Sequence, residues 1–310
     1  MYGDLTYSVT DRLRVNLGLR VNNENNTYGQ SSEFYPILSR SDASFKVNST
    51  RLLPKVALLY EVAPDVNTYV QWTRGYKSGG GNLGSPGVVN PGYRPEILDA
   101  YEVGLKSQFF GRRLTANVAA FYYDYTDLQV FSFTPPASSL VQNADARLYG
   151  VEGDFRANVT DHLTLSLAPT WLHGTFKNFV GVDPFSGAVV NLNDKPLPRA
   201  PNFSVNAGVE QRIDLGGTLL SQLSLTADLR YNSTTVLRYF NLSPYDRQKG
   251  YFLFDLSASV VDLDRKTRLS VFVDNVTDQI VRESSFSQAP AYIGNYGPPR
   301  TWGVRLSRRF

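Results

Sequence analysis

The chain has 310 residues, of which 42% are hydrophobic and 13% are aromatic. A membrane helix needs a run of about 18 apolar residues, and the chain has no run of that length, which excludes an α-helical membrane span. The absence of cysteine excludes disulfides, thiolate chemistry and cysteine-ligated metals. The net charge is +3 and basic residues are interleaved with acidic ones, so nothing indicates a nucleic-acid partner.

Alternation of apolar and polar residues recurs from one end of the chain to the other. Successive strand side chains point to opposite faces of a sheet, so each alternating run predicts a strand with one apolar face and one polar face. The run from Arg12 to Asn22 has about 11 residues, the length that a tilted strand needs to cross a bilayer. In chain order, the predicted strands are residues 5–9, 12–22, 52–62, 69–76 (with no clear facing), 97–108, 114–122, 149–155, 163–171, 203–209, 223–231, 252–260, 269–273 and 301–310.

The intervals between these strands are alternately short and long. Thr10-Asp11 and Ala63-Pro64-Asp65 are short turns made of turn-forming residues. The long intervals are residues 23–50, 78–95, 131–143, 178–199, 232–249 and 278–299. Outer-membrane barrels have short periplasmic turns and long extracellular loops, so the pattern predicts an all-β, antiparallel, up-and-down transmembrane β-barrel.

The polar face of the predicted strands is rich in charge. It includes Glu152, Asp154 and Arg156 on one strand and Asp228 and Arg230 on another. An Arg or Lys that faces lipid at mid-depth costs about 2–4 kcal/mol, so we expect this face to line a water-filled lumen. The apolar face is then expected to contact outer-membrane lipid.

The C-terminal strand shows the alternation most clearly. From Thr301 onward, Trp302, Val304, Leu306 and Phe310 share one face, and the chain stops on an aromatic residue. Soluble chains usually end in loose polar residues. The last strand of a membrane barrel instead pairs on both edges and presents its outer face to lipid, so this terminus also favours a barrel.

Several motifs resemble those of TonB-dependent outer-membrane receptors. Residues 93–96 (Tyr-Arg-Pro-Glu) and 99–106 (Asp-Ala-Tyr-Glu-Val-Gly-Leu-Lys) are similar to the mid-barrel signature of this family. Residues 119–125 (Ala-Ala-Phe-Tyr-Tyr-Asp-Tyr) follow it, and residues 273–278 (Val-Asp-Asn-Val-Thr-Asp) resemble the end of the penultimate strand. The resemblance covers the whole chain, with the motifs in the family's order.

The resemblance implies a barrel of about 22 strands that is occluded by an N-terminal plug domain. We therefore expect residues 1–310 to form a single partial barrel domain, the C-terminal part of such a barrel, with no plug domain. The first residues also lack the basic and apolar regions of a signal peptide. The resemblance further implies contact with the TonB complex through the missing plug. It makes Trp302, Val304, Leu306 and Phe310 the assembly signal read by the barrel-assembly machinery.

The function that the resemblance implies is active uptake of a scarce nutrient, with a ferric siderophore as the expected cargo and no resident cofactor. Aromatic faces beside arginines suit a flat, anionic chelate, because stacking and charge act together. In the long intervals, the residues expected to bind this small-molecule ligand are Tyr76, Tyr93, Arg94, Phe131, Phe133, Arg238, Tyr239, Phe240, Tyr245, Arg282, Tyr292 and Tyr296.

The residues by themselves leave two other functions open. A small outer-membrane barrel enzyme of the protease or lipase type would need an acid–base group at its rim, for which His173 is the candidate. The other histidine, His162, lies about 30 Å away along the same strand, so we expect no catalytic or metal site. A soluble β-rich binding module would instead fold without a membrane.

Residues 79–84 match G-x-G-x-x-G, the pattern of a dinucleotide-binding turn. Such a turn opens a helix, and no helical pattern follows these residues, so we expect a loop and no cofactor site.

Overall fold

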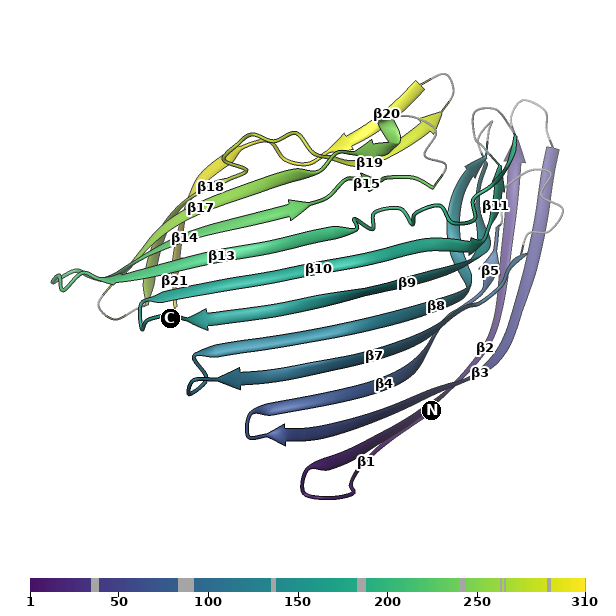
Figure 1. The fold of residues 1–310 in the computed structure, drawn as a ribbon. Helices are drawn as coiled ribbons and strands as arrows, with labels where there is room; N and C mark the ends of the chain where they lie inside the picture. Colours follow the sequence, from purple (N-terminus) through teal and green to yellow (C-terminus); the bar gives the residue numbers. More distant parts are fainter. Residues whose placement is uncertain are drawn as a thin grey trace.

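The computed structural model describes residues 1–34, 39–82, 92–134, 138–182, 188–239, 244–262, 264, 266–288 and 291–309. Its main feature is one antiparallel sheet of 13 strands, ordered as in the chain (Figure 1). These strands are β1 (Tyr2–Ser8), β2 (Leu13–Phe34), β3 (Ser39–Ala63), β4 (Val66–Lys77), β7 (Glu96–Phe109), β8 (Leu114–Thr134), β9 (Ser138–Asn158), β10 (Leu163–Asn178), β13 (Phe203–Asp214), β14 (Leu220–Asn232), β17 (Tyr251–Asp262), β18 (Thr267–Asp274) and β21 (Thr301–Arg308). The predicted number and up-and-down order of the strands are confirmed.

Two of the long intervals contain more strand than predicted. β2 and β3 stay paired as far as Phe34 and Ser39, through the polar interval of residues 23–50. β8 and β9 likewise stay paired as far as Thr134 and Ser138. In the β2–β3 hairpin, residues with little preference for strands are extended, because each added pair continues an existing ladder and satisfies its backbone hydrogen bonds.

Short two-stranded hairpins occupy the other long intervals. They are β5 (Gly80–Gly81) with β6 (Gly92–Tyr93), β11 (Val180–Val182) with β12 (Val189–Asn191), β15 (Thr235–Val236) with β16 (Arg247–Gln248), and β19 (Arg282–Gln288) with β20 (Ala291–Tyr296). A single-turn 3₁₀ helix, η1 (Pro244–Asp246), precedes β16. In the described ranges no helix is long and apolar enough to cross a bilayer. The end of the sheet that carries these hairpins is called the loop end below, and the opposite end is called the turn end.

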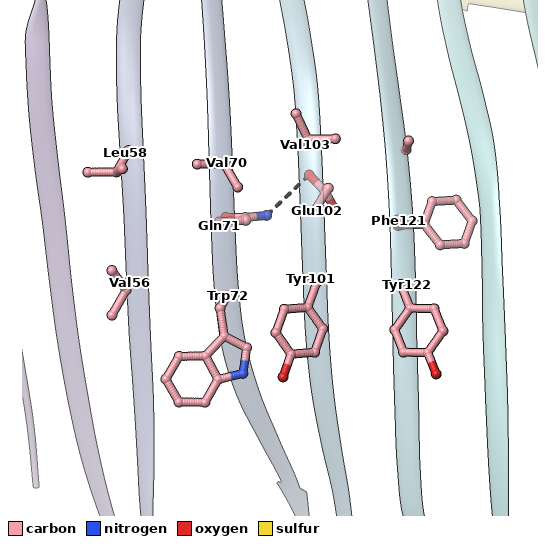
Figure 2. A pocket seen from close by; sticks show the side chains of 11 residues that line it. Val56, Leu58, Val70, Gln71, Trp72, Tyr101, Glu102, Val103, Phe121 and Tyr122 are labelled. Atoms are coloured by element: carbon pink, nitrogen blue, oxygen red, sulfur yellow. Dashed lines mark hydrogen bonds between the residues drawn. The ribbon is translucent and has the colours of Figure 1, made fainter.

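A row of aromatic side chains crosses the apolar face of the sheet, which is called the outer face below. Trp72, Tyr101 and Tyr122 lie opposite one another on β4, β7 and β8 (Figure 2), and Tyr149 on β9 continues the row. The ring centroids are 6.4 Å apart for Tyr101 and Tyr122 and 6.5 Å apart for Tyr122 and Tyr149. In membrane barrels such a girdle marks the interface between hydrocarbon and water.

The next row of the outer face, towards the loop end, is charged. Arg74 lies opposite Asp99, which lies opposite Asp124, which lies opposite Arg147. Arg74 donates Nε and Nη2 to the two carboxylate oxygens of Asp99 at 2.9 and 2.8 Å, and Lys177 Nζ donates to Asp124 at 2.7 Å. The change from aromatic to charged residues therefore places the loop-end boundary of the apolar belt between the aromatic row and the charged row.

The polar face, called the inner face below, is hydrogen-bonded across strands. On β4, Nε2 of Gln71 donates to Oε1 of Glu102 at 3.1 Å (Figure 2). The hydroxyl of Tyr69 donates to the same oxygen at 2.6 Å. The ring of Tyr69 also covers Gly104, where a Cβ atom would overlap the ring. The structure thus settles the facing of residues 69–76 at these positions: Tyr69 and Gln71 are on the inner face, and Trp72 is on the outer face.

The two edges of the sheet are the outer sides of β1 and β21. Neither edge pairs with another strand among the described residues, and the sheet curves without closing (Figure 1). On β21, Trp302, Val304 and Leu306 lie opposite Val273, Val271 and Leu269 of β18, which places all three on the outer face. They are 77%, 63% and 71% exposed. Phe310, the last residue of the predicted assembly signal, lies outside the described residues.

An arginine introduced on each face in turn tests which face contacts lipid. Val209 lies on the outer face of β13, and Glu210 lies on the inner face. We expect Val209→Arg to destabilise the membrane-embedded protein by about 2–4 kcal/mol, because the guanidinium would meet lipid. Glu210→Arg exchanges one solvated charge for another and should change stability by less than about 0.5 kcal/mol. Urea unfolding in lipid vesicles measures both, and equal losses would refute the assignment of the faces.

Candidate ligand-binding site

The predicted ligand-binding residues lie at the loop end but do not form one cluster. Tyr76, Tyr93 and Arg94 lie around β5 and β6, Phe131 and Tyr239 lie near the extended hairpin of β8 and β9, and Arg238, Tyr245, Arg282 and Tyr296 lie around β15, β16, β19 and β20. Phe240 and the side chains of Phe133 and Tyr292 lie outside the described part of the chain. Each group makes its own set of hydrogen bonds, ion pairs and ring contacts.

Tyr76 is bonded to a carboxylate of β2. Its hydroxyl and that of Ser78 both donate to Oε2 of Glu24, at 2.9 and 2.5 Å, and Nδ2 of Asn22 donates to Oε1 at 2.9 Å. These hydrogen bonds, with that of Ser78 the strongest, lower the pKa of Glu24 below its ordinary value and keep the carboxylate ionised. Tyr76 therefore connects the end of β4 to the extended part of β2.

Arg94 is also bonded within the chain. Its Nε donates to Oδ1 of Asp127 at 2.8 Å, and its backbone N–H donates to Oδ1 of Asn143 at 2.7 Å. Asp127 has a φ of 58° at the point where the register of β8 and β9 shifts. The Arg94 side chain is nevertheless 72% exposed, so its guanidinium still faces solvent while it ties the segment after β6 to the β8–β9 hairpin.

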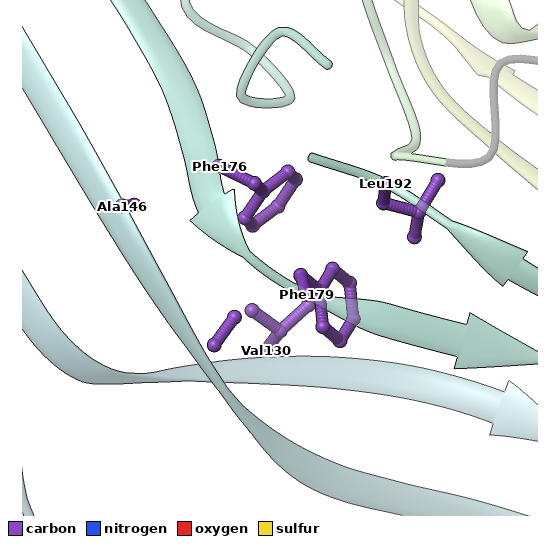
Figure 3. Close-up of a cluster of buried hydrophobic side chains, with 6 residues drawn as sticks. Val130, Ala146, Phe176, Phe179 and Leu192 are labelled. Carbon is purple, nitrogen blue, oxygen red and sulfur yellow. The ribbon is translucent and has the colours of Figure 1, made fainter. Parts of the chain in front are cut away.

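Tyr239 packs against a hydrophobic core at the loop end. Residues of β8, β9 and β10 form this core with Phe179 and Leu192, which follow β10 and β12 (Figure 3). Phe176, Phe179 and Leu192 are at most 2% exposed in this core. The Tyr239 ring packs edge-on against Phe179 with centroids 5.5 Å apart, and its hydroxyl donates to the carbonyl of Phe131 at 2.9 Å. Tyr239 thus joins the β15–β16 interval to β8, while the ring of Phe131 remains 66% exposed.

Arg282 is sandwiched between two of the predicted aromatic residues. Its guanidinium carbon lies 5.6 Å from the ring centroid of Tyr245 and 5.5 Å from that of Tyr296. Nη1 donates to the carbonyl of Tyr245 at 2.9 Å, and Nη2 donates to the Tyr296 hydroxyl at 3.3 Å. The backbone N–H of Arg282 donates to Oε1 of Gln248 at 2.8 Å. Arg282 therefore fixes the β19–β20 hairpin on η1 and β16.

A buried carboxylate strengthens the same junction. Asp246 of η1 is 3% exposed, accepts a hydrogen bond from Oγ of Ser285 at 2.9 Å and lies 3.8 Å from Nη1 of Arg238. Its carbonyl accepts the backbone N–H of Leu237 at 2.7 Å. The predicted residue Arg238 consequently serves, like Arg282, to hold the loop end together.

Replacement of Arg282 by lysine tests this bracing role. Lysine keeps the charge but loses the planar fork and most of the stacking, so the substitution is not conservative here. We expect Arg282→Lys to weaken the attachment of β19–β20 by about 1–2 kcal/mol. Hydrogen exchange of the β19–β20 amides should accelerate roughly tenfold, since about 1.4 kcal/mol corresponds to that factor. Arg112→Lys, in a turn at the opposite end, is the matched control. Unchanged exchange in β19–β20 would rule out the brace.

A cavity of about 490 Å³ lies on the inner face beneath the β19–β20 hairpin. Its volume is within the range of about 300–1,000 Å³ usual for small-molecule sites. Arg230 of β14 and Arg199, from the segment before β13, line it together with Arg282. Asp255, Asp274 and Glu283 line it as well. Opposite charges in one cavity suit a polar ligand that carries charge.

Two of the three arginines that line this cavity, Arg199 and Arg230, were not among the predicted ligand-binding residues. In the part of the chain that the structure describes, the side chains of Arg199 and Arg230 make no hydrogen bond or ion pair, whereas Arg94, Arg238 and Arg282 all do. Arg230 alternates with apolar residues and was predicted only to face the lumen. Nothing in the sequence shows that Arg199 and Arg230 line one cavity, because 31 positions separate them (230 less 199).

The two histidines lie at different places on the sheet. The ring of His173 lies 5.3 Å from that of Tyr149, in the aromatic row of the outer face. His162 lies in a turn at the opposite end, with Nδ1 3.8 Å from Asp214. Among the described residues no three His, Asp or Glu side chains gather as a metal site would need.

Comparison with known proteins places the chain in a family. Residues 1–304 match the family described as TonB dependent receptor-like, beta-barrel. The pesticin receptor of Yersinia pestis is 23% identical over 307 residues, which are 98% of this chain and 42% of that receptor. The ferric-pyoverdine 358 receptor of Pseudomonas putida is 22% identical over 307 residues, which are 98% of this chain and 34% of that receptor. The chain thus spans less than half the length of these relatives.

A solved structure has the same fold. The ferric yersiniabactin uptake receptor FyuA from Yersinia pestis aligns with a TM-score of 0.84 at 20% identity, over 100% of this chain and 45% of that one. The proteins named in these comparisons are transport receptors rather than enzymes. The family match over residues 1–304, together with the 13-stranded antiparallel sheet, confirms the resemblance seen in the motifs. The chain belongs to the β-barrel family of TonB-dependent receptors, whose members are outer-membrane proteins.

Proposed function

We propose that the chain is the C-terminal part of the barrel of a TonB-dependent receptor, and that the whole protein takes up a ferric siderophore. The cavity beneath β19–β20 carries the proposal, because three arginines line it at the loop end, where a ligand arrives first. Two relatives are named for ferric-siderophore binding or uptake, namely the ferric-pyoverdine and ferric yersiniabactin receptors. A ferric chelate with anionic groups matches this chemistry.

The direction of the strands supports the partial-barrel part of the proposal. In an antiparallel sheet of 13 strands in chain order, β1 and β21 run in the same direction. A seam between them would be parallel, whereas every other pair is antiparallel. An all-antiparallel barrel therefore needs an odd number of further strands between β21 and β1. About nine strands would complete a barrel of about 22, the size of the plugged outer-membrane transporters.

Other parts of the whole protein would supply the remaining functions. The outer face would contact lipid below the aromatic row, and the C-terminal strand would be read by the barrel-assembly machinery. A plug domain outside this chain would contact TonB and use its energy to release the ligand into the periplasm. The chain itself would hold the ligand without a resident cofactor and without catalysis.

The uptake proposal is tested by deleting the gene. Iron uptake would be measured with ferric catecholate, hydroxamate and carboxylate chelates, and growth with vitamin B12 and an oligosaccharide as limiting nutrients. We expect the deletion strain to lose uptake of one ferric chelate, and a strain without TonB to lose the same uptake. A plasmid copy of the gene should restore it. Normal uptake of every ferric chelate, with a defect for vitamin B12 or the oligosaccharide, would reject an iron cargo.

A further inference from the structure

We propose that the inner face near the turn end, where β1, β2, β3, β4 and β7 meet, docks an acidic segment of the plug domain expected outside residues 1–310. The docking surface is a cavity of about 430 Å³ that residues of these five strands line. The inference rests on the proposed function only for the presence of a plug. It adds which part of the wall the plug contacts and what chemistry the contacting segment has.

The cavity lies close to the turns, at the end of the sheet opposite the β19–β20 hairpin. Arg14 is the second residue of β2, and Lys106 lies opposite Asn67, the second residue of β4. Lys55 of β3 lies opposite Gly18 of β2. All of these positions are on the inner face, so a body inside the barrel can reach them and lipid cannot.

Cations outnumber carboxylates in the lining of this cavity. Arg14, Lys55 and Lys106 line it, and none of the three forms an ion pair within the described residues. Nζ of Lys106 lies 5.5 Å from the ring centroid of Tyr69, a contact that does not neutralise its charge. Among the described residues, Glu102 is the one carboxylate in the lining, and it already accepts two side-chain hydrogen bonds. The excess of positive charge favours an acidic partner.

A buried acceptor without a partner lies beside these cations. Asn16 is 9% exposed, and its Nδ2 donates to Oδ1 of Asp4 at 2.8 Å and to Oγ1 of Thr6 at 3.0 Å. These two bonds fix the orientation of the amide, and its Oδ1 has no hydrogen-bond partner within the described residues. A buried polar atom in this state costs about 1–3 kcal/mol. The missing partner is therefore a donor. A fully ionised small anion has none, whereas a polypeptide segment offers a backbone N–H beside a carboxylate side chain.

The length of a relative leaves room for such a domain. The 307 matched residues are 42% of the pesticin receptor, so about 420 residues of that receptor lie outside the match. Nine further strands of the average length found here, with their loops, would take about half of them. The remainder is the size of a domain, and barrels of about 22 strands have a plugged lumen. The inner face is the part of the sheet that such a domain would contact.

Cross-linking of the whole protein in lipid vesicles, without cargo, tests the contact. A carbodiimide activates a carboxylate, and a lysine amine in contact with that carboxylate displaces the resulting urea and forms an amide bond. We expect Lys55 and Lys106 to become linked to Asp or Glu side chains outside residues 1–310, which mass spectrometry identifies. Lys177 is the internal control, because its Nζ lies 2.7 Å from Asp124 and should link to it.

Substitutions show whether the cations hold the segment. In the double variant Arg14→Gln with Lys55→Gln, hydrogen exchange in the cross-linked plug segment should accelerate about tenfold, because charge-assisted hydrogen bonds are lost. Arg305→Gln is the matched control, since Arg305 lies on the inner face of β21 against Phe272 and away from the cavity. It should leave the exchange rate of the segment unchanged.

Four results would overturn the proposal. The first is that Lys55 and Lys106 become linked only to carboxylates within residues 1–310. The second is that their links join two copies of the protein, and the third is that Lys177 reacts while neither lysine does. The fourth is equal exchange in the double variant and in Arg305→Gln. Uptake is not measured in any of these experiments, so their failure is distinguishable from failure of the proposed uptake function.

Discussion

Residues 1–310, produced alone and refolded in detergent, are expected to form oligomers or aggregates rather than a monomeric sheet. The edges of β1 and β21 carry unpaired backbone N–H and C=O groups within the described structure. Each such group costs several kcal/mol in an apolar medium, and the cost accumulates along a strand. Closure of the sheet on itself would require a parallel seam between β1 and β21. Such a parallel pair is less stable per residue than an antiparallel one, and the open sheet of the structure leaves both edges unpaired. Association with further copies would pair these edges, so we expect it to compete with closure.

Size-exclusion chromatography with light scattering measures this outcome. The whole protein, refolded in the same detergent, is the control and should elute as a folded monomer if the remaining strands close the sheet. Circular dichroism would show whether strands have formed in each sample. A monomeric 310-residue chain with full strand content would contradict the expectation that these edges need partners.

The second large effect is expected at Asn275, in the motif that resembles the end of the family's penultimate strand. The side chain is 5% exposed, and its Oδ1 accepts the backbone N–H of Gln279 at 2.8 Å. Its Nδ2 donates to the carbonyls of Gln279 and Pro298 at 3.0 and 3.2 Å. The residue has a φ of 52°, which asparagine tolerates better than most residues. One side chain thus joins both ends of the interval that contains β19 and β20.

We expect Asn275→Ala to destabilise the whole protein by about 2–4 kcal/mol, since it leaves buried backbone groups without partners and strains the left-handed backbone. Asn275→Gly should recover only the strain, about 1 kcal/mol. Gln279→Ala is the matched control, because the bonds of Gln279 to Asn275 come from its backbone. Urea unfolding in lipid vesicles measures all three free energies of unfolding. A loss for Asn275→Ala no larger than that for Gln279→Ala would show that the junction is unimportant.

The strands could be predicted because their signal is local. A period of two residues follows from strand geometry alone, so the runs at residues 97–108 and 203–209 were recognisable without knowledge of their partners. The extensions of β2 and β3 were missed because Asn23, Asn25 and Asn26 have little preference for strands. They are extended only because β3 continues opposite them, which is a property of the pair.

The site could be predicted only as a set of residue types. Aromatic residues and arginines of the long intervals were predicted to bind ligand, but the hydrogen bonds and ion pairs that they make depend on partners far along the chain. Arg94 meets Asp127, and Arg282 meets Tyr245, 37 positions away. These arginines brace the loops, while the unpaired Arg199 and Arg230 were overlooked. The sequence shows which residues carry a charge, but it does not show which of these side chains are paired with a partner in the folded chain.

The most direct test of the central claim, that these 13 strands are part of a larger closed barrel, is disulfide cross-linking in the whole protein. The chain contains no cysteine, so introduced pairs within it are free of a cysteine background. Val271 and Val304 lie opposite each other on β18 and β21, and the pair Val271→Cys with Val304→Cys should cross-link. Leu5→Cys on β1 with Val304→Cys on β21 should not, because other strands would lie between them. Efficient cross-linking of the second pair would show that the 13 strands close on themselves, and it would contradict the account.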